Sequence, residues 1–234
     1  MCRLLGITNY SYEKNQELLV NFINLAKVGR VPEGSGPGHL DGWGIGYYKQ
    51  GRAVIEKSGL SILDEKDKVI DILKNIGETG ILIFHLRKSA WEGTTDIKNA
   101  HPFCYKNVIF SHNGTIRDYQ KLLEQINPND APAQDAKDTE VFFRYIMRNY
   151  TDDLNCSFHK AVETIKKENI YTAINCIFSE GSKMYVYREY TKEPDYYTLF
   201  ETKQDKSIIV CSENISNKLT WQTIEKDSLQ AYSL

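Results

Sequence analysis

The sequence predicts an α+β fold in which antiparallel sheets are covered by helices on their outer faces. Strand-like and helix-like segments occur in blocks along the chain, not in strict alternation, and such an order favours antiparallel over parallel sheets. The last third is mostly strand-like, with turn signals such as Glu180-Gly181 between its apolar segments. No repeat, low-complexity tract or break in composition marks a linker, so we expect one domain over residues 1–234.

The spacing of apolar residues, together with residues typical of element ends, predicts the first elements. Residues 3–8 form a strand-like apolar run. Apolar side chains then recur at helical spacing between Ser11, the expected N-cap, and Gly29, where we expect the helix to end. Glycine and proline crowd residues 31–42, which predicts a loop.

A hairpin follows this loop, and the remaining elements alternate between apolar runs and helical patterns. Residues 43–48 and 52–57 are predicted strands joined by a turn that ends at Gly51. We further expect helices at 69–76, 141–147 and 158–165, and strands at 81–87, 108–112, 171–178, 183–190, 196–200 and 207–212.

Charge and cysteine content narrow the classes of ligand and compartment. The chain has 29 Lys and Arg against 31 Asp and Glu, a balance that favours a small-molecule substrate over nucleic acid or a membrane. Its five cysteines are odd in number and form no C-x-x-C pair, which favours free thiols in a reducing compartment. No apolar stretch approaches the roughly 18 residues of a membrane helix and no signal peptide is evident, so we expect a cytoplasmic protein.

Cys2 stands immediately before the first predicted strand. We expect Met1 to be removed, because cysteine is small enough for ordinary methionine removal, and Cys2 would then carry a free α-amine. An α-amine titrates near roughly pH 8 and a thiol near roughly 8.5, so the two can exchange a proton at neutral pH. One residue then supplies both nucleophile and base. The alternative is an inert, small apolar residue.

Four further motifs follow in order along the chain: HLR at 85–87, NAHPF at 99–103, SHNG at 111–114 and KDTE at 137–140. With the initial Met-Cys they resemble the glutaminase domain of class II glutamine amidotransferases. The stretches MCRLLG and HLDGWGIGYY are similar to the stand-alone, single-domain branch of that family. The resemblance implies the four-layer αββα sandwich of the N-terminal-nucleophile hydrolases.

The resemblance also implies roles for individual residues. Cys2 is the nucleophile, and the Asn113 side chain with the Gly114 backbone N–H forms the oxyanion hole. Arg87 binds the α-carboxylate of the substrate with paired hydrogen bonds, and Asp138 binds its α-ammonium group. Without the resemblance, Arg87 would read as a surface arginine, Asp138 as a helix cap and Asn113-Gly114 as a turn.

Three more residues are expected at the substrate site. His85 and His112 belong to the matching motifs, and Trp43 lies in a segment that the resemblance makes part of the site wall, where Gly42 and Gly44 would let the backbone approach Cys2. Taken alone, Trp43 reads as core packing and the histidines as groups that satisfy buried backbone. With His101 they could suggest zinc, but no metal-ligand spacing accompanies them, and we expect neither a metal nor an organic cofactor.

The implied reaction is acyl transfer from a γ-glutamyl amide through a thioester on Cys2, which releases glutamate and ammonia or an amine. Because the pattern of residues 150–234 is expected to complete the strands and helices of the sandwich, we expect hydrolysis without an acceptor and a preference for a larger γ-glutamyl amide. The alternatives are an ammonia-supplying glutaminase subunit of a complex, a non-catalytic binding module with the same fold, and a papain-like hydrolase. A homo-oligomer or an ammonia-accepting partner remains open.

Overall fold

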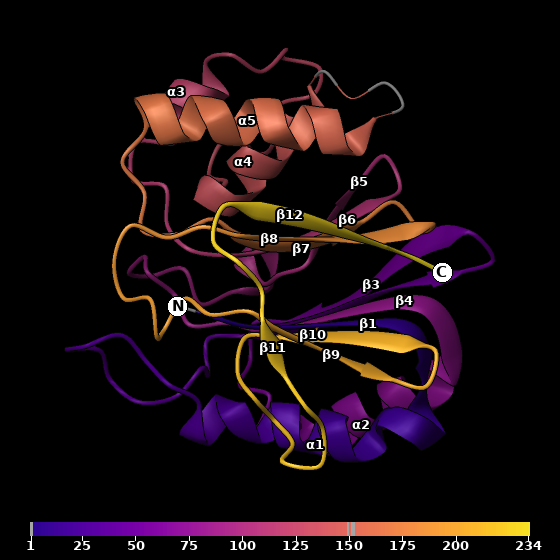
Figure 1. The fold of residues 1–234 in the computed structure, drawn as a ribbon. Helices are drawn as coiled ribbons and strands as arrows, with labels where there is room; N and C mark the ends of the chain where they lie inside the picture. The colour runs from indigo at the N-terminus through magenta and orange to yellow at the C-terminus, as the bar shows by residue number, and fades with distance from the viewer. Residues whose placement is uncertain (1, 149, 151–152) are drawn as a thin grey trace.

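Two antiparallel sheets lie face to face between two layers of helices in the computed structural model, which describes residues 2–148, 150 and 153–234 (Figure 1). Within the described residues, the first sheet has the strand order β11 (Gln222–Thr223), β9 (Phe200–Gln204), β10 (Ser207–Cys211), β1 (Arg3–Ser11), β4 (Glu78–Leu86), β2 (Trp43–Lys49) and β3 (Arg52–Ser58). The second has the order β12 (Ser228–Ser233), β8 (Lys183–Arg188), β7 (Asn175–Ser179), β6 (Val108–Asn113) and β5 (Phe103–Tyr105). This arrangement confirms the predicted α+β class and the αββα sandwich.

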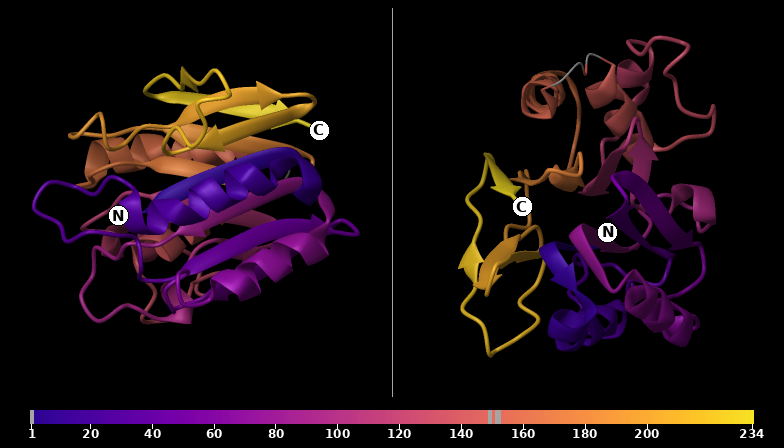
Figure 2. Two further views of the ribbon diagram at one scale, coloured as in Figure 1. Left: turned by 90° about the horizontal axis from the view of Figure 1, so that it is seen from below. Right: turned by 90° about the vertical axis from the view of Figure 1, so that its right-hand side faces the viewer.

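The helices cover the two outer faces. The first sheet is covered by α1 (Tyr12–Val28) and α2 (Lys66–Ile76), and the second by α3 (Gln120–Leu123), α4 (Asp138–Met147) and α5 (Leu154–Glu168), as the two turned views show (Figure 2). A short 3₁₀ helix, Ile97–Asn99, precedes β5. The chain thus builds a helix layer, two sheets and a second helix layer.

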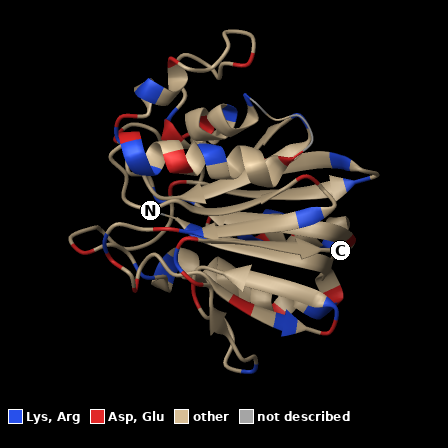
Figure 3. Ribbon diagram, turned by 45° about the horizontal axis from the view of Figure 1, so that its top comes forward, with Lys and Arg blue, Asp and Glu red and all other residues tan. Residues whose placement is uncertain are grey.

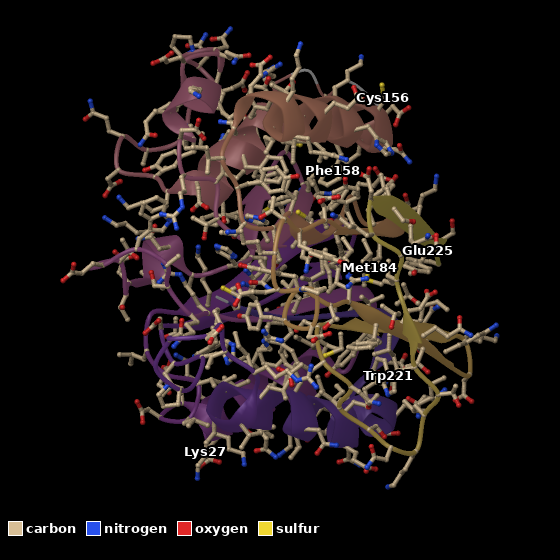
Figure 4. All side chains as sticks on the ribbon, turned by 60° about the vertical axis from the view of Figure 1, so that its left-hand side comes forward. Lys27, Cys156, Phe158, Met184, Trp221 and Glu225 are labelled. Carbon is tan, nitrogen blue, oxygen red and sulfur yellow. The ribbon has the colours of Figure 1, made fainter. Side chains whose placement is uncertain are left out.

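Apolar side chains fill all three interfaces between these layers. Phe110 stacks on Phe143 of α4 with ring centroids 5.0 Å apart, and Phe158 of α5 stacks on Phe178 of β7 at 4.6 Å, which fixes the upper helices on the second sheet. Met184 belongs to the cluster between the sheets. Figure 4 shows Phe158 beneath α5 and Met184 between the two sheets.

Gly6 lets β1 approach the second sheet closely. A Cβ atom at Gly6 would lie 2.7 Å from the Met184 sulfur and 3.0 Å from Cγ2 of Ile177, both closer than side-chain atoms pack. The absence of a side chain therefore brings β1 directly over β7 and β8. This contact places Cys2, the residue before β1, at the edge of the space between the sheets.

Several element boundaries follow the sequence patterns. Helix α1 ends at Val28, with Gly29 as its C-cap, and the hairpin turns at Gln50 and Gly51 with φ values of 52° and 75°. The predicted loop at 31–42 contains no helix or strand. The predicted helices at 69–76, 141–147 and 158–165 all lie within observed helices.

Other predictions were wrong. Ser11 is the N-cap residue of α1 but its side chain makes no cap; instead, its backbone N–H donates to Oδ1 of Asn15 at 3.1 Å. Residues 196–199 are not a strand, and β9 begins only at Phe200. The predicted strand at 171–178 starts at Asn175, after isolated bridges at Tyr171 and Ala173. Patterns in the sequence did not predict β5, β11, β12, α3 or the 3₁₀ helix.

Charged side chains of both signs are interspersed over the surface, while the strands within the sheets carry few of them (Figure 3). This distribution agrees with the balanced composition. Among the described residues, no helix has the length and apolar character needed to cross a bilayer.

Candidate active site

All of the sequence motifs converge on one small cavity at the edge of the sandwich where the N-terminal end of the chain lies (Figure 1). The cavity has a volume of about 30 Å³. Its lining includes one or two residues from each motif: Cys2, Arg87, His101, His112, Gly114 and Asp138. Residues separated by more than a hundred positions in the sequence are therefore brought together by the meeting of β1, β4, β6 and α4.

Cys2 is 7% exposed and lies against the end of β6. Its backbone nitrogen donates to Oδ1 of Asn113 at 2.9 Å, and its Sγ lies 3.7 Å from the carbonyl oxygen of Lys88. Nδ2 of Asn113 is buried and has no hydrogen-bond partner among the described residues. The Asn113 amide therefore directs its oxygen to the Cys2 nitrogen, and its two N–H donors are not used by any other described residue. The predicted removal of Met1 concerns a residue outside the part of the chain that the structure describes.

Gly114 is required by close packing rather than by an unusual backbone angle. A Cβ atom at this position would lie 1.9 Å from the carbonyl oxygen of Ala173 and 2.7 Å from Nε2 of His112. Such distances are prohibitive, so no other residue fits without moving the backbone. The Asn113-Gly114 pair is thus the tightly packed end of β6.

Arg87 is buried, not a surface arginine at a strand end. It is 5% exposed, and its guanidinium donates to Thr94 O at 2.7 Å, to Thr94 Oγ1 at 3.0 Å and to Ser89 Oγ at 3.2 Å. Because these partners belong to residues 88–94, Arg87 holds this segment, hereafter the 88–94 segment, over the cavity.

Asp138 is the first residue of α4, but it does not cap the helix. It is 4% exposed, and its carboxylate accepts from the Trp91 indole N–H at 3.0 Å and from the Ile116 backbone N–H at 2.9 Å. Burial raises the pKa of Asp138, because a carboxylate loses hydration there. The indole donor of the 88–94 segment therefore occupies one oxygen of this carboxylate.

His112 is engaged on both ring nitrogens. Nε2 lies 3.1 Å from the Ala173 carbonyl oxygen and Nδ1 lies 3.0 Å from Thr139 Oγ1. A carbonyl only accepts, so Nε2 carries the proton, and the neutral ring accepts from Thr139 at Nδ1. Burial lowers the pKa of His112, with an opposing effect of the nearby Asp138 carboxylate. The ring thus orders the wall of the site, and neither nitrogen is directed at Cys2 as a base.

His85 and His101 form a tilted ring pair beside His112, with ring centroids 4.3 Å apart and an interplanar angle of 42°. Burial lowers the pKa of both, and the positive charge of Arg87 adds to the effect. His101 lines the cavity and His85 lies behind it. Among the described residues, no group of three or more His, Cys, Asp or Glu side chains is arranged to hold a metal ion.

The structure does not bring Trp43 to the cavity. Trp43 is buried in the core between the first sheet and its helices, and its indole N–H donates to Glu65 Oε2 at 3.0 Å. The expected approach of Gly42 and Gly44 to Cys2 was also wrong. A Cβ atom at Gly44 would lie 2.3 Å from the His101 carbonyl oxygen, and one at Gly42 would lie 2.8 Å from that of Ser58. These glycines pack β2 against the NAHPF motif and β3 instead.

The sequence analysis missed the 88–94 segment. Ser89, Trp91 and Thr94 contact Arg87 or Asp138 through hydrogen bonds, although none of them belongs to a motif. The sequence offered only one indication that this segment belongs to the site, which is its position directly after Arg87.

Comparison with known proteins agrees with this geometry. The family model described as glutamine amidotransferases class-II matches residues 1–198. An uncharacterized protein of Methanocaldococcus jannaschii is 29% identical over 203 residues, which cover 81% of this chain and 51% of that protein. A glutamine-fructose-6-phosphate aminotransferase of Aquifex aeolicus is 32% identical over 129 residues, 52% of this chain and 21% of that protein. The chain thus spans about half or less of the length of these curated relatives.

Solved structures show the same fold. The glutamine phosphoribosylpyrophosphate amidotransferase of B. subtilis superposes with a TM-score of 0.69 at 16% identity and covers 99% of this chain and 49% of its own. A glutamine aminotransferase class-II domain protein from Silicibacter pomeroyi superposes with a TM-score of 0.67 at 14% identity, over 99% of this chain and 95% of its own. The family match over most of the sequence shows that the chain belongs to the class II glutamine amidotransferases.

Proposed function

We propose that this protein hydrolyses a γ-glutamyl amide through a thioester on Cys2, with the α-amine exposed by removal of Met1 as the base. The observation that carries the proposal is the arrangement of Asn113. Its Oδ1 accepts from the Cys2 nitrogen at 2.9 Å, while its Nδ2 has no partner in the part of the chain that the structure describes. An amide held in this way can orient the amine and also donate to an oxyanion formed beside the thiol.

The two charged groups at the cavity suit the two ends of an amino acid. Arg87 presents a planar fork of donors that matches a carboxylate, and the buried Asp138 carboxylate matches an ammonium group. In the ligand-free structure both are engaged by the 88–94 segment. The cavity of about 30 Å³ is also far below the roughly 300 to 1,000 Å³ of typical ligand pockets. Substrate binding therefore requires the 88–94 segment to shift and Trp91 to release Asp138.

The chemistry then proceeds in two steps. The thiol of Cys2 transfers its proton to the neutral α-amine and attacks the γ-carbonyl carbon, and Asn113 Nδ2 with the Gly114 N–H stabilises the oxyanion. The resulting ammonium gives its proton to the leaving amine as the carbon–nitrogen bond breaks, which leaves a γ-glutamyl thioester. Water attacks the thioester with the same amine as base, releases glutamate and restores the thiol. The chain needs no metal or organic cofactor for these steps.

Two further observations bear on the rival functions. Cys2 leads into a strand, and both nitrogens of His112 are engaged, whereas a papain-like hydrolase pairs a cysteine before a helix with a histidine base.

The side chain of Lys88 donates to Gly36 O at 2.7 Å and to Gly38 O at 3.1 Å, which holds the 31–42 loop beside the carbonyl that contacts Cys2. This loop is a suitable rim for a leaving group larger than ammonia.

The proposal is tested by glutamate release from glutamine and from a panel of γ-glutamyl amides and peptides, with no second protein present. We expect turnover by the wild type, highest with one of the larger compounds, and none by Cys2→Ala with an unchanged circular dichroism spectrum. Cys104→Ala, which removes an exposed thiol, is the matched control and should retain activity. Release only in the presence of an added protein would identify an ammonia-supplying subunit, and no release with any partner would favour a binding module.

A further inference from the structure

Asn175 is a buried polar residue that no motif assigns to the site. It is the first residue of β7 and is 0% exposed. Its Oδ1 accepts from the backbone N–H of Glu189 at 3.1 Å, whereas its Nδ2 has no partner among the described residues. A buried donor without a partner is destabilising, because it has lost its hydrogen bonds to water and gained none in return. Such a group therefore calls for an explanation.

Asn175 lies directly opposite Asn113 in the register of β6 and β7. Directly paired residues of antiparallel strands share one face of the sheet, with Cβ atoms about 4.5 to 5.5 Å apart. The face is the one toward the first sheet, since Ile109 and Ile177, which have the same parity along these strands, belong to the cluster between the sheets. Asn113 on this face contacts the Cys2 nitrogen. The Asn175 amide therefore lies next to the group that contacts Cys2.

The Asn175 amide is also oriented. Glu189 follows β8, which pairs with β7 on the side away from β6. Because Oδ1 is held by Glu189 on that side, Nδ2 is turned away from β8, toward Asn113 and the N-terminal end of β1. A donor in this position needs an acceptor, and in the full-length chain the Cys2 nitrogen is a peptide nitrogen without an available lone pair.

We propose that Asn175 is a positioning residue which, once Met1 is removed, donates from Nδ2 to the lone pair of the neutral α-amine of Cys2. The amine then donates one hydrogen to Asn113 Oδ1 and accepts one from Asn175 at its single lone pair, and this contact is exchanged for the thiol proton when Cys2 reacts. A hydrogen bond to the neutral form disfavours the charged form, so the contact keeps the amine neutral until that exchange. This inference rests on the proposed function, because it assigns Asn175 to the base of that reaction.

The test compares Asn175→Asp, Asn175→Ala and a control, Ser111→Ala. Aspartate keeps the shape and the acceptor for Glu189 but replaces the donor by a carboxylate, which favours the ammonium form. Alanine removes the donor without adding charge. Ser111 is a buried residue of β6 on the same face, and its hydroxyl has no hydrogen-bond partner within the described ranges. Its substitution therefore removes a buried polar group without affecting the proposed contact.

The readout is the titration of the α-amine, followed by NMR of ¹⁵N-cysteine-labelled protein after intact mass has verified the loss of Met1. The titratable groups around Cys2 stay the same in all variants. They are the Cys2 thiol, Arg3, His39, Lys88, Tyr196 and Tyr197, together with Arg87, His101, His112 and Asp138, which line the same cavity. We expect the midpoint to rise by about one pH unit or more in Asn175→Asp and by less in Asn175→Ala. It should stay unchanged in Ser111→Ala. Asn175→Ala carries the test if the aspartate variant fails to fold.

The acid limb of the pH profile of kcat/KM should shift in the same order among the variants. For Asn175→Asp we expect kcat/KM to be about tenfold below the wild-type value at a pH one unit below the wild-type midpoint, and to recover at higher pH. A purely structural role would lower kcat/KM equally at every pH. Equal amine midpoints in all four proteins would overturn the inference. The titration needs no substrate, so it is separable from failure of the proposed function, which would appear as activity retained in Cys2→Ala.

Discussion

In the proposed reaction, Arg87 would connect substrate recognition to loop structure through a single side chain. Its guanidinium is buried and donates to both the carbonyl and the hydroxyl of Thr94. A carboxylate would offer two acceptor oxygens to the same two guanidinium nitrogens. A substrate carboxylate would therefore replace Thr94 rather than fill an empty site, and binding would be coupled to movement of the 88–94 segment.

The variant Arg87→Lys keeps the charge but loses the paired donors. We expect kcat/KM for glutamine to fall by about tenfold or more, equivalent to about 1.4 kcal/mol of transition-state binding. Steady-state glutamate release measures the change. Arg52→Lys, at an exposed position that begins β3, is the control. Unchanged kinetics in Arg87→Lys would remove Arg87 from substrate recognition.

The sequence predicted which residues lie together where a recognisable motif contains them, and the roles assigned to these residues stay predictions. The motifs that contain Cys2, Asn113 and Asp138 converge as expected. Trp91 and Asn175 were not predictable, because their relevance depends on partners that only the tertiary structure supplies. Trp43 illustrates the opposite error: its neighbours in the sequence match the family, but alternation along β2 turns its ring toward the helices.

At the scale of elements, the junction between β6 and the segment before β7 is the tightest contact of the site. Gly114 sits against the Ala173 carbonyl, and His112 binds the same carbonyl through Nε2. Any increase in size at Gly114 must separate these segments and so displace the Asn113 amide. Catalytic geometry and strand packing are therefore coupled here.

We expect Gly114→Ala to lower the melting temperature by several degrees, because overpacking of this kind costs about 1 to 3 kcal/mol. Activity should fall by more than the loss of folded protein explains, since the oxyanion donors move. Gly36→Ala is a matched control, as a Cβ atom there meets nothing within 4 Å. Thermal unfolding and glutamate release are measured on the same samples. Equal melting temperatures for the two variants would contradict the packing argument.

The spacing of apolar residues predicted an element well where the element is long and buries only one of its faces. Helices α1, α4 and α5 each present an apolar face that the sequence displays. Strands β5, β11 and β12 are short or largely exposed, so they lack an apolar pattern. Tyr196, Tyr197 and Leu199 are buried, but residues 196–199 form no strand. Arg188 donates to the carbonyl oxygens of Pro194 and Tyr197 in this part of the chain. Here side chains become buried without joining a sheet.

At the scale of the whole molecule, four buried histidines set the response to acid: His39, His85, His101 and His112. Burial lowers the pKa of each of them, that of His39 to about 3. In the unfolded chain their pKa values return to about 6.5. The unfolded state therefore binds more protons below that pH, and folding stability is lost as the pH falls. Burial also raises the pKa of Asp138 and of Glu140, which opposes this trend, but these are two groups against four.

We expect the free energy of unfolding to drop steeply between pH 7 and pH 5, with each histidine adding up to about 1.4 kcal/mol per pH unit. Denaturant titrations at several pH values measure the slope. His39→Asn should make it shallower, and His159→Asn, at an exposed position of α5, should leave it unchanged. A stability that is constant from pH 7 to pH 5 would contradict the assignment of these histidines as neutral in the folded state.

The most direct test of the central claim, that Cys2 becomes the N-terminal nucleophile, is one intact-mass measurement after treatment with a diazoketone analogue of glutamine. The account predicts a mass that lacks Met1 and carries a single adduct, mapped to Cys2 by fragmentation, with no adduct on Cys2→Ala. The exposed thiols of Cys104 and Cys156 serve as internal controls for non-specific alkylation. An adduct elsewhere, no adduct, or labelling and activity in a chain that keeps Met1 would contradict it.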